Sequence, residues 1–191
     1  PKEEDQEIRT TILPEVAKKF VDLGIEVVIE VGLGSSIFID DEIYSEAGAI
    51  ITASRESALN SADIVCRINK PPQEELSLLK KNSIHISFLD PFNEKELVKD
   101  FAKHEISAIS MELVPRITRA QKMDALSSQA NLAGYAAVVE ASRIINKSFP
   151  MMMTAAGTIS PSRIFVIGVG VAGLQAIATA KRLGARVEAF D

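Results

Sequence analysis

The sequence predicts an α/β protein built on parallel β-sheets, and two observations lead to this fold class. Strand-like and helix-like segments alternate along residues 1 to about 150, which is typical of parallel strands with helices on the sheet faces. Residues 163–191 then read as strand, glycine turn, helix and strand, the order that begins a doubly wound sheet. We therefore expect a Rossmann-like or flavodoxin-like parallel-sheet domain over residues 1–150, followed by the start of a doubly wound Rossmann domain over residues 151–191.

The alternation in the first 111 residues is carried by short segments. Pro14 suits the first turn of a helix, apolar residues follow it at helical spacing as far as Leu23, and Gly24 ends the segment. The stretch Gly32–Ser36 is interpreted as a turn rather than a ligand-binding loop, because it lacks a third glycine. Further strands are predicted at residues 26–30, 49–51, 63–68, 84–89 and 107–111, and further helices at residues 40–47, 54–59, 74–79 and 94–102.

A long helical segment, residues 125–149, is expected to close the first domain. Its stretch Ala133–Ala137 has residues small enough for close contact between helices. The domain boundary is placed in residues 150–161, which are rich in Met, Thr, Gly and Pro. Because a doubly wound nucleotide domain needs several more strands than residues 151–191 can supply, we expect the chain to be part of a longer protein.

The glycine turn has the spacing of a dinucleotide-binding fingerprint. The run Gly168-Val169-Gly170-Val171-Ala172-Gly173 matches G-x-G-x-x-G, with a β-branched strand before it and a helix after it. Gly168 permits the tight turn, Gly170 leaves room for a pyrophosphate near the backbone, and Gly173 allows close packing of the helix. The N–H groups at the start of that helix, from Val171 and Ala172 onward, are expected to face the phosphates.

An acidic residue stands where such a fingerprint needs one. Asp191 ends the second strand, about 20 positions beyond the turn, where a carboxylate accepts hydrogen bonds from the adenosine ribose. A carboxylate there repels a 2′-phosphate, so the predicted cofactor is NAD(H) rather than NADP(H). The uncharged run 164–180 also resembles a membrane span, but it is shorter than the roughly 20 residues a spanning helix needs.

Composition restricts the class of protein. Hydrophobic residues make up 47% and charged residues 25%, as in soluble globular chains. The net charge of −5 and the pI of about 5.2 argue against a nucleic-acid-binding surface. The single cysteine, Cys66, cannot form an internal disulfide and is interpreted as a buried thiol in a reduced compartment. The charged N-terminus shows no signal peptide, and no metal site is expected.

Residues 112–129 form the most unusual polar stretch, and they follow a predicted strand end, where open α/β sheets place ligands. Arg116, Gln121, Asp124 and Ser127 are suitable donors and acceptors for an amide or a ribose. The stretch is equally interpretable as a solvated loop leading to a helix that Asp124 or a serine caps. The residues alone leave these two interpretations open.

The run from Met111 to Tyr135, MELVPRITRAQKMDALSSQANLAGY, closely resembles the signature of the proton-translocating NAD(P) transhydrogenases, in their NAD(H)-binding alpha subunit or domain I. Residues 1–3 with Arg9 resemble the start of that component, and residues 153–159 resemble its inter-domain segment. The resemblance covers the whole chain, which corresponds to about the first half of the component.

The resemblance implies a site and a reaction. It places the contacts to the nicotinamide end of NAD(H) on Arg116, Gln121 and Asp124, supported by Ser127 and Tyr135. It also implies hydride transfer to NADP(H) on a separate component, coupled to proton movement by a membrane component. Hydride transfer between two nicotinamides requires positioning and exclusion of water rather than a general base. A homodimer on the cytoplasmic side of a bacterial membrane, or the matrix side of an organelle membrane, is implied as well.

Two alternatives stay open. Alanine dehydrogenases share the two-domain plan, but this chain has Asn69 before Lys70 and Asp90 where that group carries a substrate-binding Lys and a catalytic His. Lys70 is one position away and is a substitute to consider. His85, which faces away from its apolar neighbours, and His104, near a helix C-terminus, are interpreted as structural. A non-catalytic NAD-sensing module is the other alternative.

Overall fold

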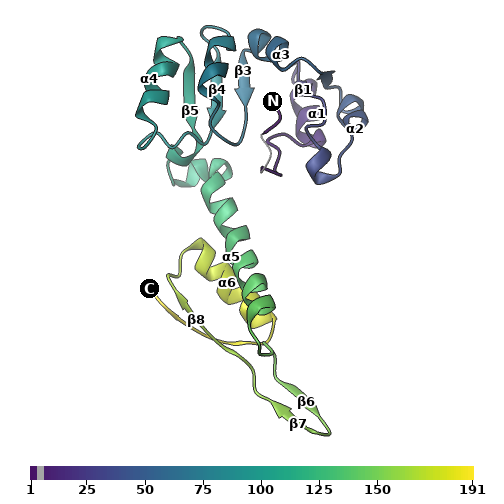
Figure 1. Ribbon diagram of the computed structural model, residues 1–191, viewed down its shortest axis with the longest axis vertical. Coiled ribbons are helices and arrows are strands. Elements are labelled where there is room, and N and C mark those ends of the chain that lie inside the picture. Colours follow the sequence, from purple (N-terminus) through teal and green to yellow (C-terminus); the bar gives the residue numbers. More distant parts are fainter. Residues whose placement is uncertain (4–6) are drawn as a thin grey trace. The chain divides into compact units, whose positions relative to one another are not determined.

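The computed structural model describes residues 1–3 and 7–191 and divides into two compact units, residues 1–114 and residues 115–191 (Figure 1). Both contain parallel strands with helices between them, which confirms the α/β class. The expected domain division at residue 150 stays a prediction. In this chain the long helix belongs with the glycine turn, because it packs on the helix that follows that turn.

Unit 1 contains two parallel sheets. The first pairs β1 (Val28–Glu30) with β2 (Ile50–Thr52), and the second has the order β3 (Ile64–Cys66), β4 (Ile84–Ser87), β5 (Ser107–Ser110). The α-helices are α1 (Pro14–Asp22), α2 (Asp41–Glu46), α3 (Arg55–Ser61) and α4 (Lys95–Lys103), and the 3-10 helices are η1 (Ser35–Ile37), η2 (Gln73–Leu78) and η3 (Met111–Leu113).

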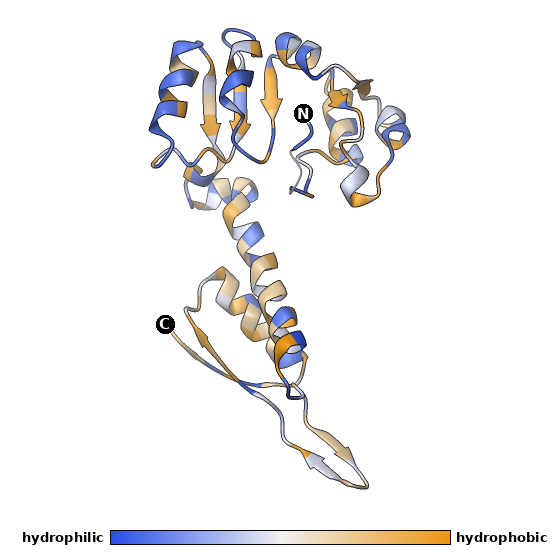
Figure 2. Cartoon of the chain, viewed as in Figure 1, coloured by the Kyte–Doolittle hydropathy of each residue, from blue (hydrophilic) through white to orange (hydrophobic). Residues whose placement is uncertain are grey.

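Two apolar cores hold unit 1 together. The first joins α1 to the first sheet and includes Ala17, Ile29 and Tyr44, whose hydroxyl donates to the Ile12 carbonyl at 2.8 Å. The second lies against the three-stranded sheet. Its members are Leu59, Val65, Leu76, Leu79, Leu89, Leu97, Phe101 and Ile106. Figure 2 shows β3 hydrophobic along its length, whereas α4 carries both colours, as an amphipathic surface helix should.

Local sequence explains several element ends in unit 1. Pro14 stands at the first position of α1, and Gly24 follows its end with φ +80°. Ser54 caps α3 by accepting a hydrogen bond from the Ser57 N–H at 3.2 Å. Residues 74–79, predicted as α-helix, form the 3-10 helix η2 instead. The preceding pair Pro71-Pro72 provides no N–H donors, and the segment is only long enough for two tight turns.

Unit 2 contains the 3-10 helix η4 (Thr118–Met123), the helices α5 (Ala125–Ile144) and α6 (Val171–Arg182), and the parallel pair β8 (Arg163–Ile167) and β9 (Arg186–Phe190). Its buried cluster includes Val138 of α5, Ala180 of α6 and Phe149. Helix α5 ends at Ile144 rather than at residue 149. The residue before Pro150 is disfavoured in a helix, and Phe149 instead turns into the core, where its carbonyl accepts from the Ser162 N–H.

The predicted boundary segment contains a hairpin that sequence patterning did not indicate. Residues 150–161 hold the antiparallel strands β6 (Met152–Thr154) and β7 (Gly157–Ile159). Gly157 closes the turn with φ +142°, a conformation that residues with side chains rarely adopt. Both strands are exposed along their length, so the apolar residues Met152, Met153 and Ile159 face solvent in this chain.

Candidate functional site

The glycine turn between β8 and α6 has the geometry that its sequence predicts. Gly168 has φ +87°, which a residue with a Cβ atom rarely adopts. Gly170 is the N-cap of α6, and a Cβ added there would meet nothing within 4 Å. A Cβ on Gly173 would lie 1.9 Å from the Gly168 carbonyl oxygen. The turn is therefore closed on its inner side and open at Gly170.

Asp191 lies beside this turn. The Gly168 N–H donates to the Phe190 carbonyl at 2.8 Å, which holds the start of the turn against the end of β9. Asp191 is the next residue, and it is exposed. Parallel pairing of Ile167 with Phe190 brings the two strand ends to one edge of the sheet. The structure thus places the carboxylate expected to bind a ribose next to the turn expected to bind phosphates.

Asp124 caps the N-terminus of α5. Its Oδ1 accepts from the Ser127 N–H at 2.9 Å, and its Oδ2 accepts from the Ser127 hydroxyl at 2.6 Å. These hydrogen bonds lower the pKa of the Asp124 carboxyl, and the Arg116 charge lowers it further. The structural interpretation of Asp124 as a cap is therefore correct. It leaves the carboxylate charged at the end of a helix that packs on the glycine-turn helix.

Three other predicted site residues, Arg116, Gln121 and Tyr135, face solvent. Arg116 and Gln121 are exposed, and Gln121 lies on η4, where its carbonyl accepts from the Asp124 N–H at 3.3 Å. Tyr135, on α5, is 52% exposed. Arg116 and Ser127 thus gather around Asp124 at one end of α5, and Gln121 lies on the turn that leads into it.

A close contact links this helix to the glycine turn. In Figure 1, α5 and α6 lie side by side, and a Cβ added to Gly134 of α5 would lie 2.1 Å from the Ala172 carbonyl oxygen. Ala172 is the fifth residue of the fingerprint. The two groups of predicted site residues are therefore connected through α5, while the binding roles assigned to them stay predictions.

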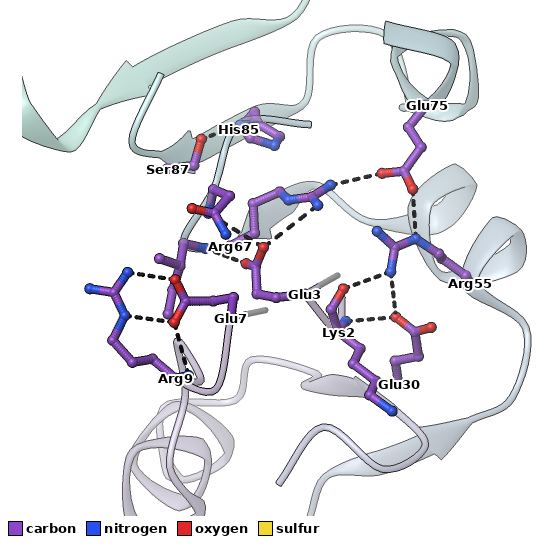
Figure 3. Close-up of polar contacts among 12 residues, drawn as sticks. Lys2, Glu3, Glu7, Arg9, Glu30, Arg55, Arg67, Glu75, His85 and Ser87 are labelled. Carbon is purple, nitrogen blue, oxygen red and sulfur yellow. Dashed lines mark hydrogen bonds and ion pairs between the residues drawn. The ribbon is translucent and has the colours of Figure 1, made fainter. Parts of the chain in front are cut away.

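Unit 1 contains a chain of ion pairs that sequence analysis missed (Figure 3). The Arg67 side chain, directly after β3, is 2% exposed and contacts the carboxylates of Glu3 and Glu75 at 3.7 and 2.8 Å. Glu75 also contacts Arg55 at 2.7 Å, and Arg55 contacts Glu30 of β1 at 3.0 Å. These charges are scattered along the sequence, so no local motif indicates that they meet.

The residues that an amino-acid dehydrogenase would use for catalysis are paired or buried in this structure. The Lys70 ammonium pairs with the Glu94 carboxylate. His85 is 1% exposed, packs at 5.2 Å against the Phe101 ring, and has a pKa lowered to about 4, chiefly by burial. Burial and the lowered pKa favour the structural interpretation of His85, which stays a prediction. Cys66 is half-buried rather than fully buried, because only one side of β3 faces the core, and burial raises the pKa of its thiol.

Among residues 1–3 and 7–191, no helix combines the length and hydropathy that a membrane span requires. The uncharged run that resembles a span in sequence is divided between β8, the glycine turn and α6.

Two family models together match nearly all of the chain. The alanine dehydrogenase/PNT N-terminal domain matches residues 1–133, and the alanine dehydrogenase/PNT C-terminal domain matches residues 137–191. The break between them falls inside α5, next to the Gly134 contact.

Curated proteins similar to this chain include NAD(P) transhydrogenase subunits and alanine dehydrogenases. An NAD(P) transhydrogenase subunit alpha polypeptide of Rhodospirillum rubrum is 48% identical over 97% of this chain and 50% of its own length. The alanine dehydrogenase of Methanococcus maripaludis is 27% identical over the whole chain and 52% of its own length. The chain spans about half the length of the curated relatives it matches.

Solved structures give the same order of similarity. A transhydrogenase from Sinorhizobium meliloti superposes with a TM-score of 0.94 at 45% identity, covering all of this chain and 57% of that one. An L-alanine dehydrogenase superposes with a TM-score of 0.86 at 26% identity, covering all of this chain and 53% of that one.

Proposed function

Because this chain belongs to the alanine dehydrogenase/PNT family, we propose that it is part of the NAD(H)-binding component of a proton-translocating NAD(P) transhydrogenase. In this proposal, hydride passes directly between NAD(H) on this component and NADP(H) on a partner component. A membrane component couples the transfer to proton movement. The proposal rests on the surroundings of the glycine turn. Asp191 follows the strand end that is bonded to the turn, and α5, which Asp124 caps, packs on the turn at Gly134.

The residues around the turn are suited to hold a dinucleotide. The open space at Gly170 leaves room for a pyrophosphate against the first N–H groups of α6, where the helix dipole favours negative charge. We assign to Asp191 the role of accepting hydrogen bonds from a ribose that lacks a 2′-phosphate. When bound, NAD(H) supplies or accepts the hydride.

The polar residues at the start of α5 are assigned to the nicotinamide end. The charged Asp124 carboxylate can accept a hydrogen bond from the N–H of the nicotinamide carboxamide. Arg116 and Gln121 can donate hydrogen bonds to the carbonyl oxygen of the same carboxamide. Ser127 holds Asp124 in place through two hydrogen bonds, and Tyr135 is exposed on the same helix. None of these roles transfers a proton to or from the reacting ring, so the site needs orientation and exclusion of water.

The proposal extends to assembly and location. The exposed apolar residues of β6, β7, β8 and β9 support an assembly, because exposed apolar surface is typical of interaction sites. We assign the whole protein to a homodimer that associates with a membrane through its partner components, on the cytoplasmic or matrix side.

An activity assay on the full-length protein tests the proposal. Mixed with an NADP(H)-binding component, it should transfer hydride from NADH to an NADP analogue, and Arg116→Ala should lower the rate by tenfold or more, roughly the loss of one charged hydrogen bond. Arg119→Ala is the matched control, because it removes an exposed arginine from the same stretch without touching the assigned set. Equal rates in both variants would contradict the assigned role of Arg116.

Amino-acid dehydrogenase activity is the second candidate, favoured by the structural similarity to L-alanine dehydrogenase. It predicts oxidation of NADH that depends on pyruvate and ammonium without any partner component. The engagement of Lys70 by Glu94 and the burial of His85 disfavour it, because the reaction needs an accessible proton acceptor.

A further inference from the structure

One face of α5 runs from the end that Asp124 caps to the residues that pack on α6. Ser127, Asn131, Gly134 and Val138 follow one another at intervals of four, three and four residues, which places them on one side of an α-helix. Gly134 and Val138 are the buried residues of α5. The face that packs on α6 therefore continues directly into the turn of helix that Asp124 caps.

Gly134 is the point of closest approach on this face. A Cβ placed there would lie 2.1 Å from the carbonyl oxygen of Ala172 and 2.9 Å from its carbonyl carbon. Both atoms belong to the backbone of the fingerprint, so no side chain can rotate to make room. Asn131, one turn earlier on α5, adds a 3.4 Å hydrogen bond from its Nδ2 to the Oε1 of Gln175.

The fingerprint side of this contact is held firmly. The Gly168 N–H is bonded to the Phe190 carbonyl, and Gly173 packs so closely on Gly168 that a Cβ would lie 1.9 Å from its oxygen. The end of α5 that Asp124 caps, in contrast, lies ten residues from Gly134. This is about 15 Å along the helix axis, at about 1.5 Å per residue. A methyl group between the helices would displace α5 more readily than the turn.

We propose that Gly134 is a positioning residue for dinucleotide binding, and that it keeps the capped end of α5 in register with the glycine turn. On this view the turn and Asp191 hold the adenosine and phosphates, while Asp124 and its neighbours hold the nicotinamide. Direct contact at Gly134 fixes the separation of the two groups. The inference rests on the proposed NAD(H)-binding function and adds to it a residue that touches no part of the ligand.

Comparison of two ligands isolates this role. NADH must reach both groups of residues, whereas ADP-ribose lacks the nicotinamide and needs only the turn and the strand end. Titration of the full-length protein carrying Gly134→Ala should show NADH binding weakened by about tenfold or more, as expected for a misplacement near 1 Å, and ADP-ribose binding within about threefold of wild type. A role in folding alone would weaken both ligands equally, and that result would overturn the proposal, as would unchanged NADH binding.

The control is Ala136→Ser, which adds one atom to an exposed position of the same helix and should leave both ligands unaffected. If Gly134→Ala does not fold, Asn131→Ala decides, because it removes the neighbouring contact without adding volume. NADH binding should then weaken while ADP-ribose binding does not, and equal affinities would refute the proposal. A wild-type protein that binds neither ligand would instead refute the proposed function itself.

Discussion

Asp124 has a visible structural role and a proposed functional one, and two substitutions separate them. Asn is as good a helix cap as Asp, since its side-chain oxygen can still accept from the Ser127 N–H. Asp124→Asn should therefore change the free energy of unfolding by only a few tenths of a kcal/mol, whereas Asp124→Ala should cost about 1 kcal/mol. The carboxylate charge is lost in both variants.

The affinity for NADH should depend on the charge of the Asp124 carboxylate and not on its role as a helix cap. A hydrogen bond to a charged acceptor contributes about 1.5–3 kcal/mol, so both variants should bind NADH roughly tenfold more weakly or worse. The assay pairs fluorescence titration of NADH with urea unfolding of the same preparations. Ser128→Ala is the control, because it removes the 3.2 Å hydrogen bond to the Asp124 carbonyl and leaves the carboxylate intact.

The result that would refute this reasoning is specific. If Asp124→Asn binds NADH as tightly as wild type, while Asp124→Ala binds weakly in proportion to its lost stability, then Asp124 is a cap and nothing more. The nicotinamide role would then rest on Arg116 and Gln121 alone.

Three further predictions concern charge, burial and packing. His85 has a folded-state pKa of about 4 against an ordinary value of 6.5, so the unfolded chain binds its proton first. Stability should fall as the pH drops from 6.5 to 4, by at most about 3 kcal/mol, and His85→Gln should flatten that dependence in urea unfolding. Arg67→Ala removes the guanidinium that contacts the buried Glu3 carboxylate and leaves Glu75 with Arg55 alone, so it should cost roughly 3–5 kcal/mol by the same method. A loss below about 1 kcal/mol would show that solvent screens the pairs. Gly173→Ala places a methyl group against a backbone oxygen and should abolish measurable NADH binding in calorimetry, whereas near-normal affinity would mean that the turn relaxes.

The parts of the fold that follow from local signals were predictable. Strand β8, the glycine turn, α6 and β9 are indicated by a β-branched run, fixed glycine spacing and a helical segment that Gly184 ends, and their arrangement is confirmed. Pro14 and Gly24 likewise indicate the bounds of α1. In these segments the conformation depends on residues within a few positions of each other.

The parts that depend on distant contacts were not predictable in the same way. The pairing of Arg67 with Glu3 and Glu75 joins segments that no spacing rule connects. The hairpin of β6 and β7 lacks the Asn-Gly or Asp-Gly turn that usually announces one. In the candidate site, the sequence identified Gly134 as small but could not show that its partner is the backbone of the fingerprint.

The central claim is that this chain builds an NAD(H) site around its glycine turn and Asp191. Calorimetric titration with NADH and NADPH, on a protein extended through the complete nucleotide domain, tests it most directly. We expect NADH to bind well and NADPH poorly. Asp191→Ala should reduce the difference in affinity between the two dinucleotides. Preference for NADPH, or binding of neither dinucleotide, would contradict the claim.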